Sequence, residues 1–234
     1  MTTIAANLQA VRARIAAAAA AAGRDPATVR LLAVSKTWPA DHVREAAAAG
    51  QIAFGENYVQ EGVAKRAELS ALPLEWHFIG PLQSNKTRLV ATSFDWVHSI
   101  EREKIARRLD EQRDPHLPPL QVCIQVNVSG EASKSGVAPD EVTALARIVA
   151  GLPRLRLRGL MCIPEPTPDK ALLQSRFETL CRLRDVLVAG GFELDTLSMG
   201  MSDDLEAAIA EGSTLVRVGS AIFGARDYTP QPTE

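Results

Sequence analysis

Short apolar runs alternate with amphipathic helical patterns along the whole chain. The runs contain many β-branched and aromatic residues and are short, which is typical of buried strands. The expected strands are 29–35, 52–54, 76–79, 96–99, 120–128, 157–163, 196–199 and 215–218. The expected helices between them lie near 39–49, 57–70, 84–91, 101–113, 139–151, 168–189 and 203–211. This alternation predicts parallel strands joined by helical crossovers.

The number of strands and the length of the chain narrow the fold class to α/β with a barrel. Eight strands close a parallel barrel, and 234 residues are near the roughly 250 that such a barrel needs. We therefore expect one (β/α)8 TIM barrel domain over residues 1–234, with a frayed tail after Tyr228. The alternative is an open doubly wound sheet, which needs fewer strands and often has a glycine-rich first turn that this chain lacks.

An extra helix is expected before the first strand. Ile4, Leu8, Val11 and Ile15 recur at helical spacing, and Gly23 can act as a C-cap. The alanine run that follows loosely resembles a signal peptide, but an amphipathic surface helix explains the apolar stripe better. No apolar run approaches the roughly 20 residues of a membrane span, so no membrane partner is expected.

Charge and cysteine content exclude several classes of function. The formal net charge of −2 and the pI of about 6.1 give no electrostatic footprint for nucleic acid or an anionic membrane. Cys123, Cys162 and Cys181 are widely spaced and odd in number, without a metal-ligand spacing. We expect no metal site and no disulfide, but free buried thiols in a reducing cytoplasm.

The functional face of a parallel barrel lies at the carboxyl ends of its strands. Lys36 follows the first strand, and the period of two places Leu32, Val34 and Lys36 toward the barrel interior. A desolvated lysine has a lowered pKa and can attack a carbonyl as a neutral amine, which is the chemistry of a Schiff base. The alternative is a lysine that reaches water from the strand end.

Two further side chains are candidates at this face. His77, in the third strand, could stack on a flat ligand ring or hydrogen-bond to it, but a satisfied core histidine is an equal alternative. Asn57, after the second strand, could position a ligand hydroxyl, but asparagine is also an excellent helix N-cap.

The last two loops resemble a phosphate site. Barrels commonly bind phosphate between the loops after strands seven and eight, against a helix N-terminus. Gly200 and Ser202 follow the seventh strand, and Gly219 and Ser220 follow the eighth. Glycine allows close approach of backbone amides to an anion, and the serines add hydroxyls. Ordinary turns would use the same residues.

The charged residues near these loops have opposite effects on a bound phosphate. Arg217 can pair with a phosphate or face a ring nitrogen, although a structural salt bridge is the alternative. Asp203 and Asp204 suit the start of a helix, but their charge opposes a phosphate unless they point away.

Five segments closely resemble the pyridoxal phosphate homeostasis protein family. They are 33–36 (AVSK), 54–61 (FGENYVQE), 76–86 (WHFIGPLQSNK), 197–203 (LSMGMSD) and 216–224 (VRVGSAIFG). The likeness runs in order from about Ile4 to Tyr228, which is nearly the whole chain. It implies one barrel similar to the N-terminal domain of alanine racemase.

The resemblance also implies a cofactor, pyridoxal 5′-phosphate, and its site. It implies an internal aldimine on Lys36 and a role in controlling cellular pyridoxal phosphate, without a recognised turnover reaction. Apo forms of enzymes that use this cofactor are the expected recipients. The implied cofactor cup consists of the positions Asn57, His77, Ser198, Met201, Arg217, Gly219 and Ser220.

The main alternative is an enzyme, such as an amino-acid racemase or a Schiff-base aldolase. A racemase needs acid–base groups on both faces of the substrate carbon. Lys36 could serve one face, but neither Tyr58 nor Tyr228 is obviously placed to oppose it. We also expect no further C-terminal domain of the kind that alanine racemase-like enzymes carry. This expectation favours a monomer without turnover. A third possibility is a barrel that binds another phosphorylated metabolite.

Overall fold

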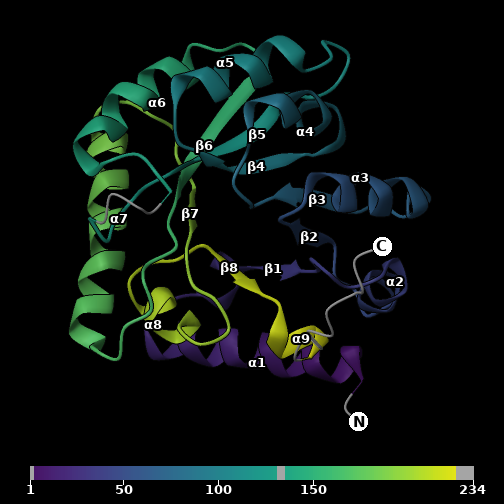
Figure 1. Ribbon diagram of the computed structural model, residues 1–234. Helices are drawn as coiled ribbons and strands as arrows, with labels where there is room; N and C mark the ends of the chain where they lie inside the picture. The colour runs from purple at the N-terminus through teal and green to yellow at the C-terminus, as the bar shows by residue number, and fades with distance from the viewer. Residues whose placement is uncertain (1–2, 131–134, 225–234) are drawn as a thin grey trace, which may run out of the picture.

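The computed structural model describes residues 3–130 and 135–224, in which eight parallel strands form one closed barrel in the order β1 to β8. Figure 1 shows the strands at the centre, with the helices around them. The strands are β1 (Arg30–Val34), β2 (Ala53–Glu56), β3 (Glu75–Phe78), β4 (Trp96–Ile100), β5 (Leu120–Gln125), β6 (Leu155–Met161), β7 (Thr196–Ser198) and β8 (Leu215–Val218). The pairing of β1 with both β2 and β8 closes the ring.

Helices connect successive strands and cover the outside of the barrel. They are α1 (Ile4–Ala21), α2 (Ala40–Ala48), α3 (Val59–Glu68), α4 (Thr87–Ser93), α5 (Glu103–Gln112), α6 (Val142–Ala150), α7 (Lys170–Ala189), α8 (Leu205–Ala210) and α9 (Ser220–Phe223). Short 3-10 turns are η1 (Pro26–Thr28), η2 (Ser84–Lys86) and η3 (Pro139–Glu141). In the described part of the chain, no helix is long and apolar enough to span a membrane.

The expected barrel is confirmed, and the open doubly wound sheet is wrong. All eight expected strands exist, with shifts of a few residues at their ends. The largest shift is in β5, which stops at Gln125 because the chain then leaves the barrel. Val126 pairs with Val137 instead, and the Asn127 amide donates to the Val137 carbonyl at 2.9 Å. The four-residue helix α9 has no counterpart among the expected helices, since one helical turn carries too little periodicity to detect. The tail after Tyr228 lies outside the described residues.

The extra N-terminal helix is also confirmed. Its apolar stripe is buried, and α1 packs against α2, α8 and α9, as Figure 1 shows along one side of the barrel. The Asn7 side-chain amide donates to the Ile222 carbonyl at 2.8 Å, which ties the helix to α9. Gly23, just after the helix, has a φ of +67°, a left-handed conformation that glycine adopts at little cost.

The barrel has two cores of different chemistry. The outer one, between strands and helices, is a continuous cluster of buried aliphatic and aromatic side chains. The inner one holds only small apolar clusters, such as Trp96 with Cys123 and Met161. Several inward-facing positions are polar instead, among them the fully buried His77 and His98. Buried polar groups must be hydrogen-bonded to be tolerated, so this inner core is ordered by directional contacts.

Candidate functional site

A cavity of about 430 Å³ opens at the carboxyl ends of the strands. Seven of the expected site residues line it: Lys36, Asn57, Met201, Ser202, Arg217, Gly219 and Ser220. The remaining lining residues are Val34, Ile79, Ile163 and Asp203. The structure thus brings together groups from β1, β2, β7 and β8 at the rim where parallel barrels place their sites.

Lys36 lies two residues after the end of β1, and the backbone on both sides of it is clamped. The Lys65 ammonium donates to the Ser35 carbonyl at 2.7 Å. The Glu61 carboxylate accepts from the Thr37 amide at 2.5 Å. Thr37 has a φ of +68°, which is uncommon for a non-glycine residue and costs roughly 1–3 kcal/mol. The clamp therefore holds a strained turn that fixes where the Lys36 side chain leaves the backbone.

A buried ion cluster beneath this turn supplies the clamp. Lys65 is 5% exposed, and its ammonium lies 2.8 Å from Glu56 Oε1 and 2.6 Å from Glu61 Oε1. The Ser35 hydroxyl donates to Glu56 Oε1 at 2.6 Å. Burial raises the pKa of Glu56 in spite of the neighbouring Lys65. The sequence interpretation missed this cluster. The sequence feature that could have indicated the cluster is the i,i+4 spacing of Glu61 and Lys65 on an expected helix.

Asn57 is an unsatisfied group in the cavity wall. Its Oδ1 atom is buried and has no hydrogen-bond partner among the described residues. The N-cap alternative is not realised, because Tyr58 occupies the cap position of α3. The neighbouring Gly80 approaches so closely that an added Cβ would lie 2.3 Å from the Asn57 carbonyl oxygen. A buried orphan acceptor costs about 1–3 kcal/mol, so Asn57 fits a ligand that donates a hydrogen bond.

The loops after β7 and β8 meet at the cavity, as the barrel rule predicts. The hydroxyls of Ser202 and Ser220 are 3.2 Å apart. Gly200 has a φ of +97°, and an added Cβ there would lie 2.7 Å from the Ala208 Cβ. Helix α9 begins at Ser220, and the first amides of a helix have no acceptor within the helix. These loops therefore place hydroxyl and amide donors on one wall.

The two aspartates of the first loop differ in their contacts. Asp204 Oδ1 accepts from the Met201 amide at 2.5 Å, so this carboxylate stabilises the loop. Asp203 is exposed and lines the cavity. Its charge is offset by the two cationic lining residues, Lys36 and Arg217, which leaves the lining with a net positive charge.

Arg217 is a buried cation at the cavity floor. It is 4% exposed, and NH1 donates to the Ser198 carbonyl at 2.6 Å and the Ser198 hydroxyl at 2.8 Å. NH2 donates to the Cys162 carbonyl at 2.9 Å. Burial lowers the pKa of Arg217, but arginine remains charged in proteins. Among the described residues it makes no ion pair, so the salt-bridge alternative is not realised, and its Nε–H makes no hydrogen bond there.

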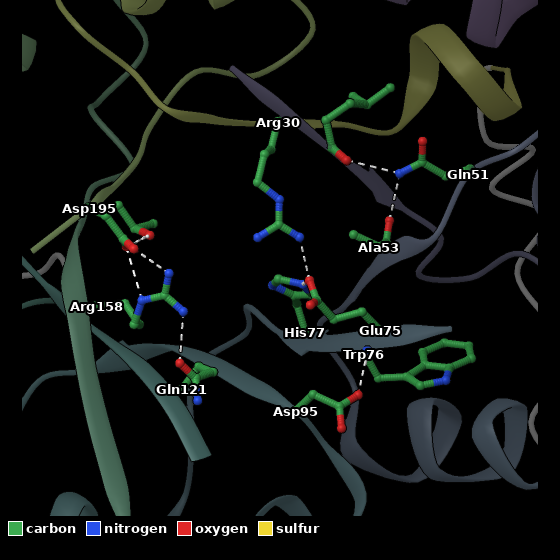
Figure 2. A network of polar contacts seen from close by, with 12 residues as sticks. Arg30, Gln51, Ala53, Glu75, Trp76, His77, Asp95, Gln121, Arg158 and Asp195 are labelled. Carbon is green, nitrogen blue, oxygen red and sulfur yellow. Dashed lines mark hydrogen bonds and ion pairs between the residues drawn. The ribbon is translucent and has the colours of Figure 1, made fainter. Parts of the chain in front are cut away.

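Two expected site residues, His77 and Ser198, do not line the cavity. Both are fully buried. Ser198 lies one hydrogen bond beyond Arg217. The ring nitrogens of His77 contact Glu75 Oε1 at 2.6 Å and His98 Nε2 at 2.9 Å, and Figure 2 shows His77 beside Glu75. His77 therefore matches the alternative of a satisfied core histidine, and its partner His98 was missed by the sequence interpretation.

The polar groups of the cavity are suited to a small anion that also carries a carbonyl and a hydrogen-bond donor. They include one amine, one guanidinium without a carboxylate partner, two hydroxyls and an orphan amide oxygen. The described residues contain no cluster of side chains that could hold a metal ion. Cys123 and Cys162 are fully buried, and burial raises the pKa of each thiol to about 12, so neither acts as a nucleophile near neutral pH.

The chain is similar to known proteins over nearly its whole length. Residues 6–227 match the family described as alanine racemase, N-terminal domain. The chain is 66% identical over 228 residues to the pyridoxal phosphate homeostasis protein of Pseudomonas aeruginosa, covering 97% of this chain and 98% of that protein. It is 58% identical over 236 residues to the protein of the same name from Escherichia coli K12, covering 98% and 99% of the two chains.

The chain is also similar to solved structures. PipY of Synechococcus elongatus, determined with PLP bound, has a TM-score of 0.83 and 39% identity, covering 95% of this chain and 100% of that one. Alanine racemase from Corynebacterium glutamicum has a TM-score of 0.67 at 18% identity, and the match covers 96% of this chain but 63% of that one. At this low identity, the likeness to alanine racemase concerns the fold alone.

Proposed function

Because the chain belongs to the pyridoxal phosphate homeostasis protein family, we propose that it binds pyridoxal 5′-phosphate in this cavity through a Schiff base on Lys36. The observation that carries the proposal is Lys36, held on a clamped turn at the rim of a cavity whose floor is a guanidinium without a carboxylate partner. When bound, the cofactor supplies a reactive aldehyde and an electron-withdrawing ring.

Each wall of the cavity has a distinct role in this proposal. The loops with Ser202, Gly219 and Ser220 bind the phosphate through hydroxyl and amide donors. Arg217 donates one of its two remaining N–H groups to the phosphate or to the ring nitrogen. Asn57 accepts a hydrogen bond from the ring hydroxyl, which satisfies its orphan oxygen. Met201 lines the cavity and packs against the ring. Ser198 does not line the cavity, but its hydroxyl accepts a hydrogen bond from Arg217.

Lys36 is expected to be the residue that carries the cofactor. Borohydride reduction of the loaded protein, followed by peptide mass mapping, should place the modification on the peptide that contains Lys36. Lys36→Arg keeps the charge but removes the primary amine, so its visible absorbance band should be lost while the protein stays folded. Modification mainly at another lysine, with Lys36 unmodified, would show that the assignment is wrong.

Storage and release of the cofactor, rather than turnover, is the proposed role. Racemisation needs an acid–base group on each face of the substrate carbon, and Tyr58 does not line the cavity. An arginine that donates to the ring nitrogen also discourages ring protonation and weakens the electron sink. The alternative, a racemase-like enzyme, rests on the alanine racemase fold.

Negligible amino-acid turnover is therefore expected. Alanine and other amino acids incubated with the loaded protein should keep their configuration when analysed by chiral chromatography. A kcat of about 1 per second or more, within the usual range of enzymes, would favour the racemase-like alternative instead.

We also propose a cytoplasmic location, a monomeric state and transfer of the cofactor to apo enzymes that depend on it. Three cysteines without a disulfide among the described residues support a reducing compartment. Sedimentation analysis of the loaded protein tests the monomer, and activation of an apo enzyme of this class tests the transfer.

A further inference from the structure

A continuous chain of hydrogen bonds runs through the barrel interior from one mouth to the other. It starts at Arg30 and Glu75, which stand at the amino ends of β1 and β3, and Figure 2 shows this end. The contacts are, in order, Arg30 NH2 to Glu75 Oε1 at 2.6 Å, Glu75 Oε1 to His77 Nε2 at 2.6 Å, His77 Nδ1 to His98 Nε2 at 2.9 Å, His98 Nδ1 to Ser198 Oγ at 2.9 Å, and Ser198 Oγ to Arg217 NH1 at 2.8 Å. The chain therefore ends at the floor of the cofactor cavity.

The Glu75 carboxylate, together with neutral imidazoles, fixes the direction of every hydrogen bond. A carboxylate can only accept, so His77 carries its proton on Nε2 and donates to Glu75. His77 Nδ1 then accepts from His98 Nε2, and His98 Nδ1 accepts from the Ser198 hydroxyl. The Arg217 guanidinium can only donate, so the Ser198 oxygen accepts from it. With both imidazoles neutral, this is the one arrangement of protons that satisfies all the contacts.

The surroundings of the two imidazoles agree with neutral rings. Burial lowers the pKa of His77, although Glu75 and Asp95 oppose this effect, and the charge of Arg30 adds to it. Burial lowers the pKa of His98 further, with contributions of the same sign from His77, Arg217 and Arg30.

The carboxylate at the far end remains ionised. Burial alone would raise the pKa of Glu75, but the hydrogen bond from His77 and the charge of Arg30 outweigh it, so the pKa of this carboxylate lies below its usual value. The Arg217 guanidinium at one end and the Glu75 carboxylate near the other polarise the bonds between them in the same direction.

From this geometry we infer that Ser198, His98, His77 and Glu75 are positioning residues, which orient the Arg217 guanidinium toward the cofactor. Two backbone carbonyls, of Ser198 and Cys162, hold NH1 and NH2, and the Ser198 hydroxyl adds a third contact. That hydroxyl keeps its lone pair toward Arg217 because His98 takes its proton. The inference rests on the proposed function for the identity of the ligand, but the hydrogen bonds join side chains of the protein itself.

The tautomers are measured first, in the protein without cofactor. The protein has four histidines. The double variant His42→Gln, His116→Gln removes the two that lie outside the barrel interior. In this double variant, ¹⁵N NMR at pH 7 and 8 should show two neutral imidazoles, each protonated at Nε2. An imidazolium, or a proton on Nδ1 of either ring, would overturn the inferred direction of the chain. This result does not depend on cofactor binding.

Cofactor affinity is measured second, by absorbance titration with pyridoxal phosphate. Ser198→Ala removes one hydrogen bond to Arg217 and should weaken binding about threefold to tenfold. Thr196→Val is the matched control, because it removes a buried hydroxyl from the same strand that bonds Asp195 rather than the chain, and it should change affinity less than about twofold. Arg217→Gln sets the upper limit, about tenfold to a hundredfold.

The two arms separate failure of the inference from failure of the proposed function. Absence of binding by the unmodified protein would contradict the proposed function and leave the tautomer result standing. Normal binding by the unmodified protein, with equal affinities for folded Ser198→Ala and Thr196→Val, would overturn the positioning role. In the double variant, the His98 Nδ1 signal should also move on addition of pyridoxal phosphate, and this movement should be lost when Arg217→Gln is added.

Discussion

Lys65→Met is expected to lower the free energy of unfolding by about 3–5 kcal/mol, the usual loss when one partner of a buried ion pair is removed. The Lys65 ammonium is bonded to Glu56, Glu61 and the Ser35 carbonyl. Without it, the Glu56 carboxylate, which is fully buried, loses its cation. Denaturant unfolding at pH 7 measures the change, because stability falls linearly with denaturant.

Two further variants locate the cause of this loss. Lys104, on α5, is exposed, so Lys104→Met should stay within about 0.5 kcal/mol of the unmodified protein. Glu56→Gln removes the charge that Lys65 compensates, so the double variant with Lys65→Met should lose less than the sum of the two single variants. Additive losses would contradict the coupling.

Lys65→Met should also slow the attachment of the cofactor to Lys36 by more than the loss of stability explains. Lys65 and Glu61 hold the backbone on either side of Lys36, and the φ of Thr37 is left-handed. A relaxed turn would place the Lys36 amine differently. Attachment is measured well below the unfolding midpoint, where the variant is folded. An attachment rate equal to that of the unmodified protein would contradict this role of the clamp.

Gly159→Ala is expected to destabilise the barrel by at least the upper part of the about 1–3 kcal/mol range for overpacking. An added Cβ at Gly159 would lie 1.7 Å from the Thr196 carbonyl oxygen on the neighbouring strand. Both atoms belong to or adjoin the backbone, so no rotamer change relieves the clash. The register between β5 and β6 also shifts here, between Val122 and Cys123, where a strand glycine often marks a bulge.

Gly151→Ala is the matched control for this substitution. Gly151 is exposed and ends α6, and an added Cβ would meet its nearest neighbour at 3.5 Å, an ordinary contact. Its φ of −81° suits alanine, so its stability should be unchanged or slightly raised. Thermal and denaturant unfolding compare the two variants. A Gly159→Ala protein as stable as Gly151→Ala would mean that β6 and β7 separate at little cost.

The sequence by itself determined the order and kind of the elements. The strands are buried on both faces and therefore appear as short apolar runs. The N-terminal helix buries one face, so its period of 3.6 appears directly in the residue pattern, as with Ile4, Leu8, Val11 and Ile15 in α1. Because parallel strands present their carboxyl ends at one rim, the positions of Lys36, Asn57, Arg217 and the two glycine–serine loops could be predicted together. The structure brings them to one cavity.

Only the tertiary structure decided which polar side chains meet inside the barrel. His77 and His98 lie on different strands, and their 2.9 Å contact depends on strand register and barrel closure. The same holds for Ser198 with Arg217 and for Lys65 with Glu56. Local periodicity shows which face a residue occupies but not its partner across the barrel. A hydrogen bond in a buried site requires donor and acceptor within about 3 Å, and closure of the eight strands sets that distance.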